Sequence, residues 1–231
     1  MLTTENKNIM IVNERIVTYI NSLKTENTQI LNEIEQEALE AFVPIIRPEM
    51  QTFLKTVLAM KMPERILEVG TAVGFSALLM AEYNPVPCRI TTIENYEKRI
   101  PVARRNFRRA GREDQITLLE GDAACWLKKL EESYDLIFMD AAKGQYIHFM
   151  EDVIRLLKPG GVLISDNVLQ DGQIIESRFA VTRRDRTIHK RMRDYLYRLT
   201  HDPALRTSVL PFGDGVTMSV KLQKQEQKEQ L

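Results

Sequence analysis

The sequence predicts an α/β fold in which a mostly parallel sheet is covered by helices on both faces. Short apolar runs alternate with amphipathic stretches long enough to form helices, a repetition that is typical of parallel sheets. Near the C-terminus, two β-like runs are joined by the turn-forming residues 212–215, which predict an antiparallel pair at the end of the sheet. The expected parallel strands are 65–69, 89–93, 116–119, 135–139 and 161–165, and the expected hairpin strands are 207–211 and 216–222.

Residues 1–60 are expected to form a helical cap over one face of this sheet. Apolar residues recur near a period of 3.6 from Ile9 to Leu23 and again from Ile30 to Phe42. The segment 43–48 interrupts the pattern, because each of its two prolines biases the preceding residue away from helix. Residues 49–60 resume it.

We find no internal repeat and no linker, so we expect residues 1–231 to form a single domain. The tail 223–231 contains only Gln, Lys and Glu before its last residue, and we expect it to be frayed. With 44% hydrophobic and 28% charged residues and no net charge, the composition is that of an ordinary globular protein, which argues against a surface coated in positive charge.

The N-terminal residues lack the basic-then-apolar pattern of a secretion signal, and no uncharged apolar run approaches the ~18 residues of a membrane span. We therefore expect a cytoplasmic protein. Cys88 and Cys125 have no ligand-like spacing, so we interpret them as reduced thiols.

A glycine-containing loop follows the first expected strand. Segment 66–76 runs from a buried strand through Glu68, Gly70 and Gly74 into a helix. Glycine there lets the backbone turn and lets a ligand approach without a Cβ in the way, and ligands of open α/β sheets bind beyond the carboxyl ends of the strands. The spacing is not the dinucleotide fingerprint, and the acid suits a cationic or hydroxyl-bearing ligand. The alternative is an ordinary glycine turn.

Acidic residues end the next two expected strands. Glu94 follows 89–93, where a carboxylate can accept hydrogen bonds from both hydroxyls of a ribose. Asp122, followed by Ala123, comes after 116–119, where it can accept from an adenine amino group. With the glycine loop, these residues predict one site shaped for adenosine.

The fourth and fifth expected strands end in Asp140 and in Asp166-Asn167. Adjacent strand ends would bring these three side chains together, and two carboxylates with an amide oxygen suit Mg²⁺. Lys143, just beyond Asp140, can take a proton or steady an oxyanion. The alternative is that these residues are loop caps and a surface lysine.

At these motifs the chain resembles the cation-dependent class I O-methyltransferases, the family that includes catechol and caffeoyl-coenzyme A methyltransferases. The resemblance covers nearly the whole chain from about Val43 onward. Within the family, the chain is similar above all to the bacterial enzymes that methylate 5-hydroxyuridine in tRNA. The segments that support this closer resemblance are 43–45, 68–72, 140–146, 166–169 and 213–215.

The resemblance implies a Rossmann-like class I methyltransferase fold, with a seven-stranded sheet, a reversed last strand and extra N-terminal helices. It implies S-adenosylmethionine and Mg²⁺ as cofactors, Lys143 and Asp140 as catalytic residues, and a metal site formed by Asp140, Asp166 and Asn167. The residues that it places around S-adenosylmethionine are Ile46, Glu68, Gly70, Ser76, Glu94, Asp122, Ala123 and Asp140.

One departure from the family pattern concerns the substrate. Catechol-type enzymes have a glutamate just before the terminal Asp-Gly, which holds a second hydroxyl. Here Leu210, Pro211, Phe212 and Gly213 precede Asp214, so that acid is absent and a catechol substrate is disfavoured.

Two basic runs bear on the substrate. The later run follows the Asp166-Asn167 motif and includes aromatic residues, a combination that fits phosphate contacts and base stacking. The earlier run, 98–112, either extends that surface or merely solvates a helix. The candidate RNA-binding residues of the later run are Arg178, Arg183, Arg184, Arg186, Lys190, Arg191 and Arg193.

From these observations we expect methylation of 5-hydroxyuridine at the tRNA wobble position, which gives 5-methoxyuridine, with tRNA as the macromolecular partner. The alternative is a small-molecule O-methyltransferase that acts on phenols. A third hypothesis is a non-catalytic RNA-binding module, against which Asp140, Lys143, Asp166 and Asn167 together argue. A homodimer is also expected, because relatives are often dimers and the N-terminal helices can supply a contact face.

Overall fold

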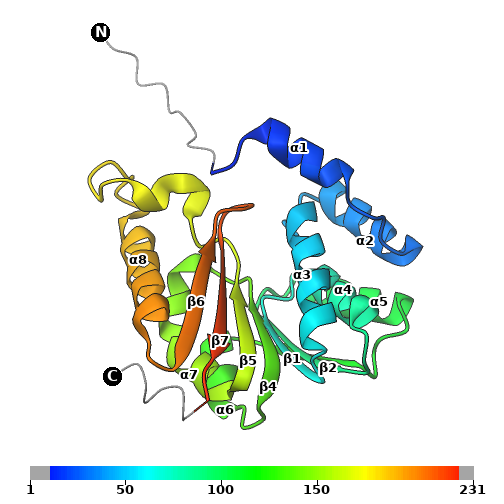
Figure 1. The fold of residues 1–231 in the computed structure, drawn as a ribbon. Coiled ribbons are helices and arrows are strands. Elements are labelled where there is room, and N and C mark those ends of the chain that lie inside the picture. Colours follow the sequence, from blue (N-terminus) through cyan, green and yellow to red (C-terminus); the bar gives the residue numbers. More distant parts are fainter. Residues whose placement is uncertain (1–10, 224–231) are drawn as a thin grey trace.

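A computed structural model describes residues 11–223. It shows a seven-stranded sheet with helices on both faces (Figure 1). Ile9 and residues 224–231 of the expected frayed tail lie outside the described residues. The strands are β1 (Arg65–Val69), β2 (Arg89–Glu94), β3 (Ile116–Glu120), β4 (Tyr134–Met139), β5 (Leu157–Ser165), β6 (Leu205–Leu210) and β7 (Val216–Lys221). The helices are α1 (Glu14–Ser22), α2 (Gln29–Glu40), α3 (Pro48–Lys61), α4 (Phe75–Tyr83), α5 (Ile100–Arg109), α6 (Ala123–Lys129), α7 (Tyr146–Leu156) and α8 (Arg186–His201), with the short 3₁₀ segments η1 (Lys143–Gln145) and η2 (Gln170–Ile175).

The strand order is β3-β2-β1-β4-β5-β7-β6. The pairs from β3 to β5 are parallel, whereas β7 runs antiparallel to both β5 and β6. The predicted α/β architecture, with a mostly parallel sheet and a reversed last strand, is therefore confirmed. All seven expected strands are present, and β1 has the expected bounds.

The largest difference from the expected strands is at β5, which begins at Leu157 rather than at 161. Pro159 and Gly160 argue against a strand, since proline cannot donate a hydrogen bond within a sheet. The structure accommodates them at an irregularity, where the register with β4 shifts between the pairs Tyr134–Leu157 and Leu136–Val162.

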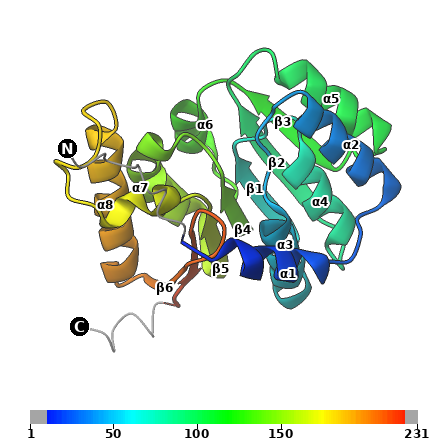
Figure 2. The same ribbon diagram turned by 90° about the horizontal axis from the view of Figure 1, so that it is seen from above.

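The sheet is buried on both faces, and side chains of β4 alternate between two apolar cores. Leu136 and Phe138 pack into the core beneath α2, α3, α4 and α5. Ile137 and Met139 pack into the opposite core, beneath α6, α7 and α8. Figure 2 shows the sheet between these two helical layers. Such continuous apolar strands are typical of parallel sheets.

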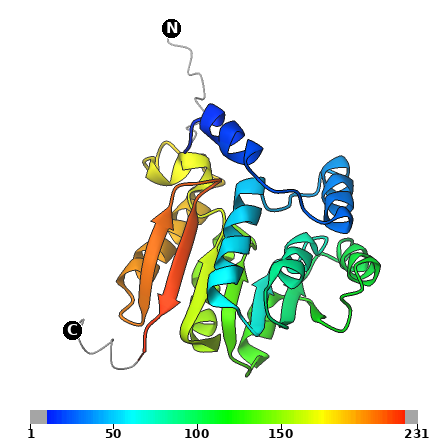
Figure 3. The ribbon, with the colours of Figure 1, turned by 45° about the vertical axis from the view of Figure 1, so that its right-hand side comes forward.

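The N-terminal helices cover the α3–α4 side of the molecule, as expected. In α2, Leu31, Ile34 and Ala38 are buried in the first core. In contrast, α1 has no buried residue and lies across the upper end of the sheet, near α3 (Figure 3). Its exposed apolar side chains leave a face open, but the expected homodimer stays a prediction.

Among residues 11–223, no helix is both long enough and apolar enough to cross a membrane. Cys88 is buried, Cys125 is exposed, and both are free thiols, as expected.

Candidate functional site

A cavity of about 660 Å³ opens at the carboxyl ends of the parallel strands. Residues that end or follow β1 to β5 form its floor. Its other walls are the loop 44–47 before α3 and the turn 212–214 between β6 and β7. β1 and β4 are neighbours at the point where the strand order reverses, which is where open α/β sheets bind ligands. The volume is within the range of ~300–1,000 Å³ that is usual for ligand pockets.

Gly70 lets the ends of β1 and β4 approach each other. Its φ of 107° is unfavourable for other residues, and a Cβ atom added there would lie 2.0 Å from the carbonyl oxygen of Asp140. Gly74 has a φ of 85°, and its missing side chain leaves room for the Phe107 ring. Both glycines are therefore required by the turn from β1 into α4, and Gly70 also sets the floor of the cavity.

Glu68 lies beneath this floor rather than in it. The residue is fully buried, and its carboxylate accepts hydrogen bonds from Ser76 Oγ and Thr92 Oγ1, both at 2.5 Å. Thr71 Oγ1 lies 2.6 Å from Thr92 Oγ1 and extends the network. Burial raises the pKa of Glu68 to about 7, against the opposing effect of the two hydroxyl donors. Only Ser76 and Thr71 of this network line the cavity. Glu68 thus reaches the cavity through Ser76.

Glu94 and Asp122 both line the cavity, on the side expected to hold adenosine. Glu94 is buried, and its Oε2 accepts the backbone N–H of Ala72 at 2.7 Å. Its Oε1 accepts the N–H groups of Asn95 and Tyr96. These bonds fix the carboxylate at the end of β2, against the glycine loop.

Asp122 is the N-cap of α6, where its Oδ1 accepts the Ala124 N–H at 2.7 Å. Asp122, Ala123 and Gly121 line the cavity together. The capping bond orients the carboxyl group at the cavity wall.

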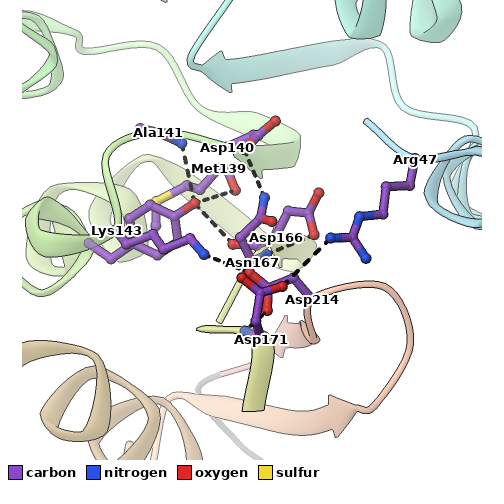
Figure 4. Close-up of polar contacts among 10 residues, drawn as sticks. Arg47, Met139, Asp140, Ala141, Lys143, Asp166, Asn167, Asp171 and Asp214 are labelled. Atoms are coloured by element: carbon purple, nitrogen blue, oxygen red, sulfur yellow. Dashed lines mark hydrogen bonds and ion pairs between the residues drawn. The ribbon is translucent and has the colours of Figure 1, made fainter. Parts of the chain in front are cut away.

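Asp140, Asp166 and Asn167 meet at the ends of β4 and β5, as the sequence predicts for adjacent strands. Asn167 Nδ2 donates to Asp140 Oδ1 at 3.2 Å, and the Asp166 N–H donates to the Met139 carbonyl at 2.9 Å. All three side chains line the cavity. Figure 4 shows them gathered around one space, with Asn167 between the two aspartates.

The charges of this cluster fit a cation. Burial raises the pKa of Asp140. Burial, and then repulsion from Asp140, raises the pKa of Asp166 to about 7. The buried carboxylate of Asp166 and the partly buried carboxylate of Asp140, beside an amide oxygen, form a hard-oxygen donor set, and a divalent ion would offset their repulsion. Within the described residues there is no group of three His, Cys, Asp or Glu side chains able to hold a metal. The candidate set therefore depends on the amide of Asn167.

The Tyr146 hydroxyl connects the end of β4 to the end of β5. Its ring is fully buried, and its hydroxyl lies 3.2 Å from the Met139 carbonyl and 3.1 Å from the Asp166 carbonyl. The same oxygen accepts the Ala141 N–H at 3.2 Å. Tyr146 is thus a structural support for the acidic cluster. The sequence analysis included it only as the last residue of segment 140–146 and assigned it no role.

Lys143 is held by Asp214, a buried residue of the β6–β7 turn. Lys143 Nζ lies 2.6 Å from Asp214 Oδ2, and Asp214 Oδ1 accepts the Asp171 N–H. Lys143 is not among the residues that line the cavity, whereas Asp214 is. The lysine therefore reaches the edge of the site through this ion pair.

The loop after Asp166 is backbone-strained. Asn167, Gln170 and Asp171 all have positive φ values, between 51° and 60°, which non-glycine residues rarely adopt. The bond from the Asp171 N–H to Asp214 helps to hold this conformation. Strain of this kind is concentrated at functional sites.

The later basic run forms the turn before α8 and the first half of that helix. Arg191 Nη1 donates to the Gly144 carbonyl at 3.2 Å, so α8 packs on η1 beside the cavity. Arg193 Nη1 donates to the Ile174 carbonyl, and Arg186 lies over the Phe179 ring. Arg183 and Arg184 are exposed and, within residues 11–223, have no ion-pair partner. In Figure 1 this turn lies at the same end of the sheet as the β6–β7 turn.

The earlier basic run has a different environment. Its arginines on α5 pair with acids: Arg109 with Glu37 at 2.8 Å, and Arg104 with Glu120 at 2.5 Å. Arg112, just beyond α5, pairs with Glu82. Acids of α2, β3 and α4 thus neutralise part of this run, which favours its interpretation as a solvated helix face.

Of the residues expected around the cofactor, Ile46, Gly70, Ser76, Glu94, Asp122, Ala123 and Asp140 line the cavity, and Glu68 does not. The lining also includes Arg47, Tyr96 and Arg99, which no sequence motif indicated apart from their proximity to Pro48 and Glu94. Thr71 and Thr92 were also missed, although a buried carboxylate such as Glu68 requires hydrogen-bond donors.

Comparison with known proteins places these features in one family. The model of the O-methyltransferase family matches residues 21–222. A catechol O-methyltransferase of Niastella koreensis is 32% identical over 169 residues, which cover 71% of this chain and 76% of the relative. A caffeoyl-CoA O-methyltransferase of Eucalyptus gunnii is 32% identical over 184 residues, which cover 74% of this chain and 71% of the relative.

A solved structure is similar over most of its length. The crystal structure of an O-methyltransferase from Bacillus cereus in complex with S-adenosylhomocysteine matches with a TM-score of 0.79 and 26% identity. The match covers 90% of this chain and 97% of that chain.

Proposed function

Because the chain belongs to the O-methyltransferase family, we propose that it moves the methyl group of S-adenosylmethionine onto an acidic ring hydroxyl, with the help of a divalent cation. It has the Rossmann-like fold of this family. The observation on which the proposal rests is the position of Asp140, Asp166 and Asn167, which share one cavity with the glycine loop and Glu94.

The cofactor would lie along the floor of the cavity. Glu94 would bind the ribose hydroxyls and Asp122 the adenine, while the sulfonium end would lie over Gly70 beside Asp140, since all four residues line the cavity. The related Bacillus cereus structure holds S-adenosylhomocysteine, the product that S-adenosylmethionine leaves after transfer. This arrangement brings the methyl group next to the acidic cluster, which is a contribution of positioning.

At the reacting end, Asp140, Asp166 and Asn167 would hold Mg²⁺, which when bound polarises a hydroxyl and lowers its pKa. Lys143, paired with Asp214 at the edge of the site, would stabilise the negative charge of the acceptor oxygen. The oxygen forms the new bond to the methyl carbon, and the electron pair of the broken C–S bond stays on sulfur. The hydroxyl proton passes to bulk water before or during transfer, because the bound cation lowers the pKa of the hydroxyl.

Small phenols are the acceptor class that the relatives support. Two relatives are named for catechol and for caffeoyl-CoA. The cavity volume of about 660 Å³ accommodates a cofactor and a small ring together. The missing acid before Gly213 favours a single acidic hydroxyl over a catechol within this class.

A second candidate acceptor is 5-hydroxyuridine at the tRNA wobble position, which would become 5-methoxyuridine. The exposed Arg183 and Arg184, in the turn that leads into α8, favour it, because phosphate contacts need accessible cations near the cavity. Its hydroxyl is also a single acidic ring hydroxyl. The chemistry at the acidic cluster would be the same for both acceptors.

One experiment separates the two acceptors. The double variant Arg183→Glu/Arg184→Glu is compared with Arg89→Glu/Arg206→Glu, a matched charge reversal at exposed residues on the amino-terminal ends of β2 and β6. Methyl transfer is measured to a simple phenol and to tRNA that contains 5-hydroxyuridine. If tRNA is the acceptor, its methylation collapses in the first variant alone and falls steeply with added salt, and phenol methylation stays unchanged. If neither acceptor is methylated by the unaltered protein, the proposed function is wrong.

A further inference from the structure

Arg47 occupies the wall of the cavity opposite the acidic cluster. It is the N-cap residue of α3, where the chain leaves the loop 44–47. A Cβ atom added to Gly213 would lie 4.0 Å from Arg47 Cδ, so the arginine stem runs along the β6–β7 turn. Figure 4 shows the guanidinium directed toward the space between Asp166 and Asp171.

Arg47 is the basic side chain at the end of the cavity that contains the acidic cluster. Within the described residues, Arg47 and Arg99 are the two basic side chains among those that line it. Arg99 is at the other end, over the ring of Tyr96 and next to Glu94. Lys143 is already paired with Asp214 at 2.6 Å. An acceptor that enters beside Asp166 therefore meets one positive side chain that is not held by a close partner.

The partner of Arg47 in this structure is easily exchanged. Its Nη2 lies 3.7 Å from Asp171 Oδ1, and the two side chains are 55% and 69% exposed. Ion pairs that are this long and this exposed contribute little stability. A guanidinium presents a planar fork of donors, which matches the two oxygens of a carboxylate or phosphate much better than one oxygen at this distance.

We propose that Arg47 binds an anionic group of the acceptor, a carboxylate or a phosphate. In the absence of the acceptor, the Asp171 carboxylate pairs with Arg47 in place of that anion. The inference rests on the proposed methyl transfer, and it adds a specificity determinant to that site. The anion lies on the Arg47 side of the acceptor ring, and the reacting hydroxyl faces Asp140 and Asp166. A phenolic acid and a nucleotide both have this layout, so the shared chemistry is an oxyanion a short distance from an acidic ring hydroxyl.

The test uses matched pairs of acceptors that differ in this charge. One pair is 4-hydroxybenzoate and its methyl ester, which have a single ring hydroxyl, and the other is 5-hydroxyuridine 5′-monophosphate and 5-hydroxyuridine. For Arg47→Gln, we expect KM for the charged member to rise by about tenfold or more, as the loss of one charge-assisted hydrogen bond implies. KM for the neutral member should stay within about twofold of its value in the unaltered protein, because the neutral member loses no charged contact. The pair that shows the effect identifies the source of the anion.

Two further variants sharpen the result. Arg47→Lys keeps the charge and should restore part of the affinity for the charged member, because an ammonium lacks the fork. Asp171→Asn removes the competing carboxylate and should lower KM for the charged member. Arg89→Gln, an exposed arginine at the amino-terminal end of β2, is the control for loss of a surface charge and should change neither value.

Equal changes of KM for charged and neutral members in Arg47→Gln would overturn the inference. Equilibrium binding of the same four compounds, in the presence of S-adenosylhomocysteine and Mg²⁺, separates this failure from failure of the proposed function. If none of the four compounds is methylated but the charged members still lose affinity in Arg47→Gln, the subsite stands and the acceptor proposal fails. If binding is unaffected by the substitution, the subsite itself is wrong.

Discussion

Lys143 Nζ and Asp214 Oδ2 lie 2.6 Å apart, and this ion pair connects the segment after β4 to the turn between β6 and β7. Asp214 is almost completely buried, whereas the Lys143 side chain is one-third exposed. The other oxygen of the same carboxylate accepts the Asp171 N–H. One carboxylate therefore positions both the candidate catalytic lysine and the strained loop that follows the acidic cluster.

Asp214→Asn should lower kcat by roughly 10²-fold, the low end of the loss expected when one group that stabilises an oxyanion is removed, because Lys143 loses its anchor. KM for S-adenosylmethionine should stay unchanged, since the cofactor end of the cavity is distant from the pair. Steady-state kinetics at saturating Mg²⁺ measures the split between the two constants.

Asp135→Asn is the matched control for this prediction. It removes a second Asp–Lys pair, in which Asp135 lies 2.8 Å from Lys158 at the opposite end of β4. The control should lower stability and leave kcat intact. A comparable loss of kcat in both variants would show that Asp214 acts only by stabilising the fold.

Gly70→Ala should be much more destabilising than Gly111→Ala. Both glycines have positive φ values, which cost a non-glycine residue about 1–2 kcal/mol. At Gly111 nothing lies within 4 Å of the added Cβ, so this backbone cost is all that is expected. At Gly70 the Cβ meets the Asp140 carbonyl at 2.0 Å, and β1 and β4 must separate. Chemical denaturation and S-adenosylmethionine binding measure the difference, and equal losses would contradict the assigned close approach.

Glu68→Gln should change how stability depends on pH. The folded protein holds the pKa of Glu68 at about 7, above the ordinary value of 4.5, because the group is buried. Between these two values the unfolded chain gives up the proton and the folded chain keeps it. Stability therefore falls as pH rises through this window, by roughly 3 kcal/mol.

The Gln variant cannot titrate and should lack this decline. Urea denaturation at pH 4.5 and pH 8 measures it, with the exposed Glu113→Gln as the control for loss of a carboxylate. If the free energies of unfolding of the Glu68→Gln and unaltered proteins differ by the same amount at both pH values, Glu68 does not titrate in this window.

Tyr146→Phe should weaken Mg²⁺ binding without creating a cavity in the core. The ring stays in place, but the hydroxyl that joins Met139, Ala141 and Asp166 is lost. Loss of such a support typically costs about 10–100-fold in metal affinity. The measurement is the Mg²⁺ concentration that gives half-maximal methyl transfer. Tyr134→Phe, at the first residue of β4, is the control and should leave that concentration unchanged.

Much of the fold follows from local sequence pattern. The strand ends that hold Glu94, Asp140 and Asp166 were predictable because parallel strands all present their carboxyl ends at one edge. The start of β5 was not predictable, because Pro159 and Gly160 are typical of a loop. Their place in a strand is explained by the irregular pairing with β4.

Contacts between distant segments were beyond what sequence pattern predicts. The burial of Glu68 beneath the cavity depends on hydroxyls from α4 and β2, and the Lys143–Asp214 pair joins residues 71 positions apart. Charge runs were similarly ambiguous, because 98–112 and 178–193 are equally basic in sequence. Pairing with α2 neutralises part of the first run, a fact that depends on tertiary structure.

The proposed methyl transfer requires a divalent ion held by Asp140, Asp166 and Asn167. The most direct test is the rate of methyl transfer from S-adenosylmethionine as Mg²⁺ is added back to protein treated with EDTA, for the unaltered chain and for Asp166→Asn. We expect no transfer in EDTA, recovery with added Mg²⁺ in the unaltered chain, and a shift of that recovery to far higher Mg²⁺ in the variant. Full activity in EDTA would contradict the account.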